Sequence, residues 1–355
     1  MSGRLSAALR NIDLRDSMRH LHQTSRERSC SSLGKAVAKV LRFAEGYLLS
    51  ATWLAAFVIS GHTTLLQAAQ VCVKDDLKRE VCAPKSVKKI VSLSPGSTEL
   101  IYAAGAGKQV VAVDDHSDYP PAVAKVPRVG GFPNVSVEAI AAMKPDLVVA
   151  WAGGNSPKVT SKLESLGVRV FYIDPLSFPE IASVIRRLGK LFGTSAVADK
   201  EAKRFLARYQ SIKKKYRFKK PVTVFYEIWN KPLMSISRNQ IIGQVIELCG
   251  GQNIYADSKI QVPKVSMESL LGKNPEVIVS SSNLKDGKAI EERWSKWSDL
   301  QAVKQHHLIT VPGNLISRPA PRALDAAESL CQQLESVRKE SLARASKTPA
   351  NTHKE

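Results

Sequence analysis

The chain has 355 residues, which is enough for two lobes of ordinary domain size, and its 44% hydrophobic content can supply buried cores. The formal net charge is +20. A basic balance is compatible with nucleic acid or a membrane surface as a partner. However, the lysines are scattered apart from one dense run at 213–220, and no nucleic-acid-binding motif accompanies them. We interpret that run as a solvated helix end and do not expect a nucleic-acid-binding protein.

Residues 1–69 are predicted to be an N-terminal extension that ends in a signal peptide. An apolar stretch at 47–59 follows Lys35, Lys39 and Arg42, and Ala68 and Ala69 come after it. Basic, apolar and small segments in this order are typical of a secretory signal, so we expect export and cleavage near Ala68 or Ala69. The stretch is shorter than the roughly 20 residues that span a bilayer, and an uncleaved anchor is the alternative.

Residues 70–175 are predicted to form a first lobe, led by a hairpin over 71–81. The chain then alternates between β-rich runs and helical patterns. Strands are expected at 89–93, 109–113, 147–150 and 168–173, and helices at 99–104, 137–143 and 157–166. This alternation implies a mostly parallel sheet with helices on both faces.

A linking helical segment is expected over 176–218. Between 194 and 218, apolar residues recur in steps of three and four, and Lys and Arg occupy the other face. About 22 helical residues reach about 33 Å at 1.5 Å per residue. We interpret this helix as a rigid strut that joins two α/β lobes.

The alternation begins again in a second lobe at 219–338. Strands are expected at 222–228, 277–280 and 308–311, with helices over 240–248, from near Ser266, and over 321–337 as a closing amphipathic helix. Residues 339–355 are expected to be a disordered tail.

An internal repeat relates the two lobes. Residues 135–149 recur at 265–279 as one helix–turn–strand unit, with a constant offset of 130 and no gap. Ser136 and Ser266 occupy helix-capping positions, and Glu138 and Glu268 lie in the first turns, where the helix dipole favours negative charge. The predicted fold class is therefore α/β, with two pseudo-symmetric lobes of mostly parallel sheets joined by one long rigid α-helix.

Four cysteines remain after the signal peptide, and an oxidising compartment favours two disulfides. A hairpin turning around Leu77 would place Cys72 opposite Cys82. Cys249 and Cys331 would then pair and tie the second lobe to its final helix; two buried thiols are the alternative. No CxxC or Cys/His cluster is present, so a zinc site is not expected.

Six motifs carry a resemblance to a known family. They are Ser94-Pro95-x-x-Thr98-Glu99, Ser117-Asp118-Tyr119-Pro120, Lys144-Pro145-Asp146-Leu147-Val148, Trp151-x-Gly153-Gly154-Asn155, Cys249-Gly250-Gly251-x-Asn253-Ile254 and Ser317-Arg318-x-x-Pro321-Arg322. With them, residues 72 to about 337 resemble the periplasmic substrate-binding proteins of ABC importers whose lobes are joined by one rigid helix (class III). That class binds vitamin B12, haem, iron-siderophores and some metal ions. The Trp-x-Gly-Gly-Asn stretch and the cysteines at 249 and 331 look most like those of the cobalamin-binding members.

The resemblance implies a ligand site for cobalamin, or a related corrinoid, in the cleft between the lobes. Open α/β sheets bind ligands at the carboxyl ends of their strands. The residues that meet this criterion or the family's positions are His116, Phe132, Trp151, Trp229, Asn314 and Arg318. Aromatic faces would pack against the flat corrin, and Asn and Arg would bond its edge amides.

Several of these assignments keep an alternative. The characterised relative has Tyr, Trp and Asp where this chain has His116, Phe132 and Asn314. His116 would either approach the cobalt face or pack as a polar aromatic. Trp151 and Trp229 would either contact the ligand or belong to the lobe cores.

The resemblance also implies docking to a membrane permease dimer. Glu138 and Glu268 match the positions where the family places one carboxylate per lobe to pair with Arg residues of the permease. On the sequence alone they are ordinary helix-start residues. The resemblance implies a periplasmic monomer whose lobes close weakly on the transported ligand, with no cofactor of its own.

A haem or ferric-siderophore carrier of the same class is the next alternative, but such carriers gather several cleft arginines. Here Arg318 is the main candidate, and Arg322 is expected to start the closing helix. A metal-ion carrier needs three or four converging ligands. Only His116 lies on an expected cleft loop, whereas His306 and His307 precede a strand and are expected to be exposed.

A periplasmic enzyme is the most distant alternative. The chain has no Gly-x-Ser-x-Gly motif, and Gly105-Ala106-Gly107 closes a helix where a dinucleotide loop would open one. Asp114, Asp115 and Asp118 follow a strand, but such residues more often cap turns. We therefore expect neither catalytic residues nor a metal site.

Overall fold

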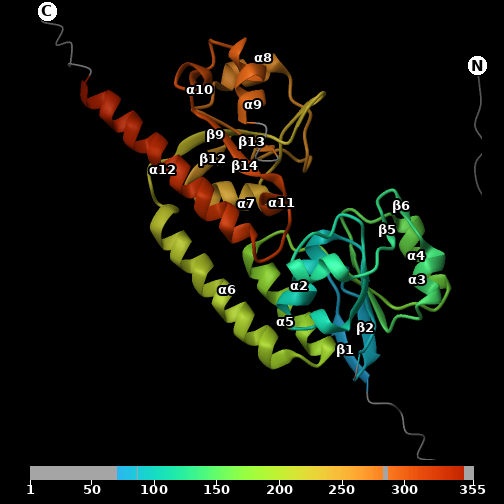
Figure 1. Ribbon diagram of the computed structural model, residues 1–355. Helices are drawn as coiled ribbons and strands as arrows, with labels where there is room; N and C mark the ends of the chain where they lie inside the picture. Colours follow the sequence, from blue (N-terminus) through green and yellow to red (C-terminus); the bar gives the residue numbers. More distant parts are fainter. Residues whose placement is uncertain (1–69, 86, 283–286, 348–355) are drawn as a thin grey trace, which may run out of the picture. The chain divides into compact units, whose positions relative to one another are not determined.

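Two parallel β-sheets organise the computed structural model, which describes residues 70–85, 87–282 and 287–347 (Figure 1). The predicted signal peptide, its cleavage site and residues 348–355 lie outside this range. Among the described residues, no helix combines the length and the apolar character needed to cross a membrane.

The first lobe contains a four-stranded sheet in the order β4-β3-β7-β8, with all neighbours parallel. Its strands are β3 (Ile90–Ser92), β4 (Val110–Val113), β7 (Leu147–Trp151) and β8 (Val170–Ile173). Its helices are α2 (Pro95–Ala103), α3 (Val137–Ala142) and α4 (Pro157–Ser165), with short 3₁₀ turns η1 (Gly107–Gln109) and η2 (Pro121–Lys125). The antiparallel pairs are β1 (Gln70–Lys74) with β2 (Glu80–Pro84), and β5 (Gly130–Gly131) with β6 (Asn134–Val135).

The start of α2 differs from the prediction. The helix begins at Pro95, four residues before the predicted start at Glu99. Ser94 caps it, because its hydroxyl accepts the N–H of Ser97 at 3.2 Å. Proline is tolerated in the first turn, where its missing N–H has no intrahelical partner.

The predicted linking segment forms two helices, α5 (Phe178–Phe192) and α6 (Ser195–Tyr216). Gly193 ends α5 in the left-handed conformation, at φ 72°. Both helices bury apolar residues in a core that also includes strands of both lobes. The long predicted helix is thus present as α6, and it leads directly to the first strand of the second lobe.

The second lobe repeats the sheet plan of the first. Its parallel sheet has the order β12-β9-β13-β14, formed by β9 (Val222–Glu227), β12 (Gly251–Asn253), β13 (Val277–Ser282) and β14 (Leu308–Pro312). In both lobes the order is second strand, first, third, fourth. The repeated unit becomes α3–β7 in one lobe and α8–β13 in the other, which confirms the pseudo-symmetry predicted from the 130-residue offset.

The remaining elements of the second lobe complete its two faces. They are the antiparallel pair β10 (Trp229–Asn230) and β11 (Leu233–Met234), and the helices α7 (Ile241–Leu248), α8 (Met267–Lys273), α9 (Gly287–Ser295), α10 (Gln301–Lys304), α11 (Gly313–Ile316) and α12 (Ala323–Lys347). One face of each sheet contributes to the shared core, together with α2, α5, α6, α7 and α12. The opposite faces pack against α3 and α4 in the first lobe, and against α8, α9 and α10 in the second.

The predicted tail is partly wrong. The closing helix continues to Lys347, so residues 339–347 are helical where disorder was expected. One contact that holds this extension is made by His307, which was expected to be exposed but is 5% exposed. Its Nε2 lies 3.2 Å from the Glu340 carboxylate, and its Nδ1 lies 3.1 Å from the Glu276 carbonyl oxygen.

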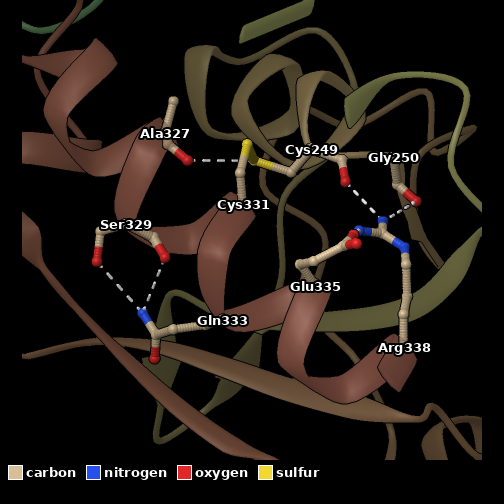
Figure 2. The surroundings of a disulfide bond; sticks show 8 residues. All are labelled: Cys249, Gly250, Ala327, Ser329, Cys331, Gln333, Glu335 and Arg338. Carbon is tan, nitrogen blue, oxygen red and sulfur yellow. Dashed lines mark hydrogen bonds and ion pairs between the residues drawn. A yellow bond between two sulfur atoms is a disulfide. The ribbon is translucent and has the colours of Figure 1, made fainter. Parts of the chain in front are cut away.

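Both predicted disulfides are confirmed. Cys72 pairs with Cys82 across the β1–β2 hairpin, and Cys249, at the end of α7, pairs with Cys331 of α12. Figure 2 shows the second bridge beside Arg338, whose guanidinium donates to the carbonyls of Cys249 at 2.6 Å and Gly250 at 3.0 Å. Gly250 has φ 68°, and a Cβ there would lie 2.6 Å from the Tyr216 carbonyl oxygen, so only glycine fits this turn.

Candidate functional site

Hydroxyl groups connect the carboxyl end of β3 to the start of α2. The Thr98 hydroxyl lies 2.8 Å from that of Ser92 and 2.7 Å from that of Ser117, and all three residues are buried. Ser117 also bonds to the Asp114 carboxylate, whose pKa is raised by burial despite this bond. This web joins the Ser-Pro-x-x-Thr-Glu motif to the loop after β4 and sets the position of Glu99.

An ion-pair cluster links the two lobes. The buried Glu99 carboxylate receives Arg322 Nη2 at 2.5 Å and Nε at 2.9 Å, and Arg318 Nη1 at 3.3 Å. Arg318 also pairs with Asp118, and Arg322 lies over the Tyr119 ring at 3.9 Å. Burial alone would raise the pKa of Asp118, but the hydrogen bonds and charges of Arg318 and Arg322 outweigh it and lower this pKa. Two cations and two carboxylates thus compensate each other where the two lobes meet.

Trp151 ends β7 and is held on two sides. Its indole N–H donates to the Asp174 carboxylate at 2.9 Å, and its backbone N–H donates to the Asn155 side chain at 2.7 Å. A Cβ at Gly154 would lie 2.1 Å from the indole ring, which explains a glycine in this motif. Burial raises the pKa of Asp174, although the bond from Trp151 opposes this. The indole is 40% exposed, so Trp151 is not a core residue.

A mainly apolar cavity of about 260 Å³ lies between the lobes. It is lined by Ser94, Pro95, Gly96, Ser97, Trp151, Ile173, Pro175, Ser317, Arg318 and Pro319. The structure therefore places two of the six predicted ligand residues, Trp151 and Arg318, in the lining of one cavity at the carboxyl ends of the strands.

The other four predicted ligand residues do not line this cavity. Trp229 is 61% exposed and donates its indole N–H to the Lys231 carbonyl at 2.9 Å, so it is not a core residue either. Phe132 is 66% exposed, and Asn314 and His116 are also exposed. Their ligand roles stay predictions.

Glu138 and Glu268 occupy equivalent and exposed positions in the first turns of α3 and α8. Each helix is capped as predicted, because Ser136 accepts the N–H of Ala139 and Ser266 accepts that of Ser269, both at 3.2 Å. Hydrogen bonds from its own N–H and from Ser266 lower the pKa of Glu268. The structure thus places an exposed carboxylate at the matching position of each lobe, and the docking role of these two residues stays a prediction.

Comparisons with known proteins agree with this architecture. The sequence profile of the family described as periplasmic binding protein matches residues 90–315. The vitamin B12-binding protein of Vibrio cholerae serotype O1 is 35% identical over 258 residues, which are 72% of this chain and 92% of that protein. The chain belongs to the periplasmic binding protein family.

Solved structures of other periplasmic binding proteins support the fold class. The periplasmic vitamin B12-binding protein BtuF of Vibrio cholerae is 36% identical, with a TM-score of 0.66 over 72% of this chain and all of that one. The periplasmic haem-binding protein RhuT of Roseiflexus shares the fold at 23% identity, with a TM-score of 0.63 over 71% of this chain and 99% of that one. The class III α/β fold predicted for this periplasmic binding protein is therefore confirmed.

Sequence reasoning missed the partners of the cleft residues. Glu99 and Asp174 were not predicted as site residues, although both contact one. Glu99 lies more than 200 residues from Arg318 and Arg322 in the chain, so no local pattern connects them. Glu99 ends one of the quoted motifs and Arg318 and Arg322 belong to another, which was the only sequence signal for this cluster; Asp174 lies in none of the motifs. Within the described residues no cluster of three or more His, Cys, Asp or Glu suits a metal ion.

Proposed function

We propose that this protein captures cobalamin, or a related corrinoid, between its lobes in the periplasm and delivers it to an ABC transporter permease. The observation that carries the proposal is the cavity in which Trp151 faces the Ser317–Arg318–Pro319 segment at the strand carboxyl ends. Its apolar lining suits the face of a macrocycle. The cavity is far smaller than cobalamin, so it would hold one edge of the ligand while the rest lies in the open cleft.

The compensated arginines favour a corrinoid over an anionic ligand. Arg318 is paired with Glu99 and Asp118, and Arg322 is paired with Glu99. A haem or ferric siderophore carries carboxylates or other anionic groups that need uncompensated cations. A corrin is edged by neutral amides, which need only hydrogen-bond partners. Permease docking through Glu138 and Glu268 is supported by their matching exposed positions in the two lobes.

Calorimetric titration of the purified protein with cyanocobalamin tests the ligand, with haem and a ferric siderophore as controls. We expect tight one-to-one binding of cyanocobalamin and at least about tenfold weaker binding by Trp151→Ala. Leu166→Ala is a matched control on an exposed apolar residue outside the cavity. If the protein bound haem or the siderophore but not cyanocobalamin, the corrinoid proposal would be wrong and the bound compound would become the candidate transported ligand.

A further inference from the structure

The C-terminal end of α6 carries an unusual surface, formed by residues 213–220 and called here the basic helix end. It contains six Lys or Arg residues and no acidic residue: Lys213, Lys214, Lys215, Arg217, Lys219 and Lys220. All except the half-buried Lys213 are exposed. Phe218 lies in the middle of this run with 87% of its surface exposed, the largest exposed fraction among the large hydrophobic residues of the described part of the chain.

The charge of the basic helix end is only partly balanced by its neighbours. Earlier in the same helix, Arg204 pairs with Glu201 at 2.7 Å, and Arg208 pairs with Asp325 at 2.6 Å and Glu328 at 2.8 Å. In the basic helix end, Lys219 pairs with Glu335 at 3.2 Å. The side chains of Lys214, Arg217 and Lys220 have no acidic partner among the residues that the structure describes.

Helix stability accounts for only part of this run. Cations in the last turn favour the negative end of the helix dipole, and Lys213, Lys214 and Lys215 occupy that turn. Arg217, Lys219 and Lys220 follow the last residue of the helix, where the dipole's benefit fades. An exposed phenylalanine contributes nothing to helix stability either. The dipole therefore does not explain the second half of the surface.

We propose that the basic helix end is a docking surface for a membrane rich in anionic phospholipids. Clustered cations are attracted to the negative potential of such a surface, and an exposed aromatic side chain inserts at the headgroup boundary. Proteins of the periplasmic binding protein family are located beside lipid bilayers, so an anionic membrane surface is accessible to them. Phe218 distinguishes the surface from an ordinary solvated helix end.

The neighbouring hollow does not favour a small anion as the ligand. Arg217, Lys219 and Arg238 line a space of about 370 Å³, but Glu247 and Asp257 line it as well. Arg238 is already paired with Asp257 at 2.6 Å. The surplus charge is therefore spread along the exposed run, as suits an extended anionic surface, and is not focused in a pocket.

Vesicle co-sedimentation of the purified protein tests this proposal. We expect binding to vesicles of phosphatidylcholine mixed with phosphatidylglycerol, no binding to phosphatidylcholine alone, and release by salt. Lys214→Ser/Arg217→Ser/Lys220→Ser should bind roughly 100-fold more weakly. Lys108→Ser/Lys200→Ser/Lys203→Ser removes the same charge from exposed sites elsewhere and should bind nearly as the unmodified protein does. Phe218→Ala should bind about tenfold more weakly.

Three outcomes would overturn the proposal. They are equal binding to both kinds of vesicle, equal weakening by the two triple variants, and binding to polyglutamate or DNA without binding to vesicles. The last result would assign the surface to an acidic protein or a nucleic acid. Cyanocobalamin titration of the variants is an independent readout, because the basic helix end lies outside the ligand cavity.

Discussion

At the scale of single residues, the bond between Trp151 and Asp174 gives the sharpest test of the ligand site. Asp174→Leu removes the carboxylate that accepts the Trp151 indole N–H, so this hydrogen bond no longer holds the ring in place. We expect cyanocobalamin affinity to fall about fivefold, equivalent to about 1 kcal/mol. Asp174→Asn keeps an acceptor oxygen and should stay near the original affinity. Equal losses in both variants would refute this positioning role.

Asp118 predicts a pH dependence of folding stability. Its pKa is lowered by Arg318 and Arg322, so its contribution is present above the unfolded pKa of about 4 and is lost as pH falls below it. The contribution should be no more than about 1 kcal/mol at pH 7, because the side chain is 52% exposed. Urea unfolding of the original protein and Asp118→Asn measures it. Their difference should be constant between about pH 5 and 7 and shrink at lower pH; a difference that persists at about pH 3 would contradict this.

At the scale of elements, the two disulfides should contribute unequally. Cys249–Cys331 closes a separation of 82 residues and Cys72–Cys82 one of 10. Chain entropy predicts about 4.5 kcal/mol for the long loop and about 2.7 kcal/mol for the short one. Urea unfolding of Cys249→Ala/Cys331→Ala and Cys72→Ala/Cys82→Ala compares them, each variant serving as the other's control. A larger loss from the short loop would contradict the entropic explanation.

Some helices and strands could be predicted from sequence patterns and others could not. Strands such as β7 and β13 are apolar runs after a capped helix, so they were predictable. β12 consists of Gly251, Gln252 and Asn253, which carry no apolar pattern, and it forms only because β9 offers an open edge. The last turns of α12 are polar and resemble a tail, but His307 and Glu340 meet there.

The candidate site was predictable only in part, for a related reason. Strand ends and motifs pointed to Trp151 and Arg318, which do share a cavity. The ion pairs that compensate Arg318 depend on how two lobes approach each other, and no segment of the sequence encodes that approach by itself. The periodicity of apolar residues predicts which face of a helix or strand is buried. It does not predict which charged residue from a distant part of the chain will contact that element.

At the scale of the whole molecule, the exposed glutamates predict a separation of ligand binding from transport. Glu138→Lys/Glu268→Lys should abolish corrinoid uptake in cells, because reversed charges would repel the permease arginines. Cyanocobalamin affinity should be unchanged, since neither residue lines the cavity. Lys144→Glu/Lys273→Glu is the control: it reverses one exposed charge on each lobe at a different position and should retain uptake. Unchanged uptake by the glutamate variant, or a loss of affinity, would refute the docking assignment.

The shared strand order of the two lobes has a consequence for the history of the chain. A gene that encoded half of this protein, once duplicated and fused, would leave two sheets of one plan and a constant sequence offset. Before fusion, two identical halves would have formed a twofold-symmetric dimer. A symmetric receptor keeps selecting the features that both halves present to it, whereas an asymmetric ligand selects for their divergence. On this account, the helix starts at Glu138 and Glu268 would be the part in which the two halves stayed alike, and the loops at the strand ends the part in which they diverged.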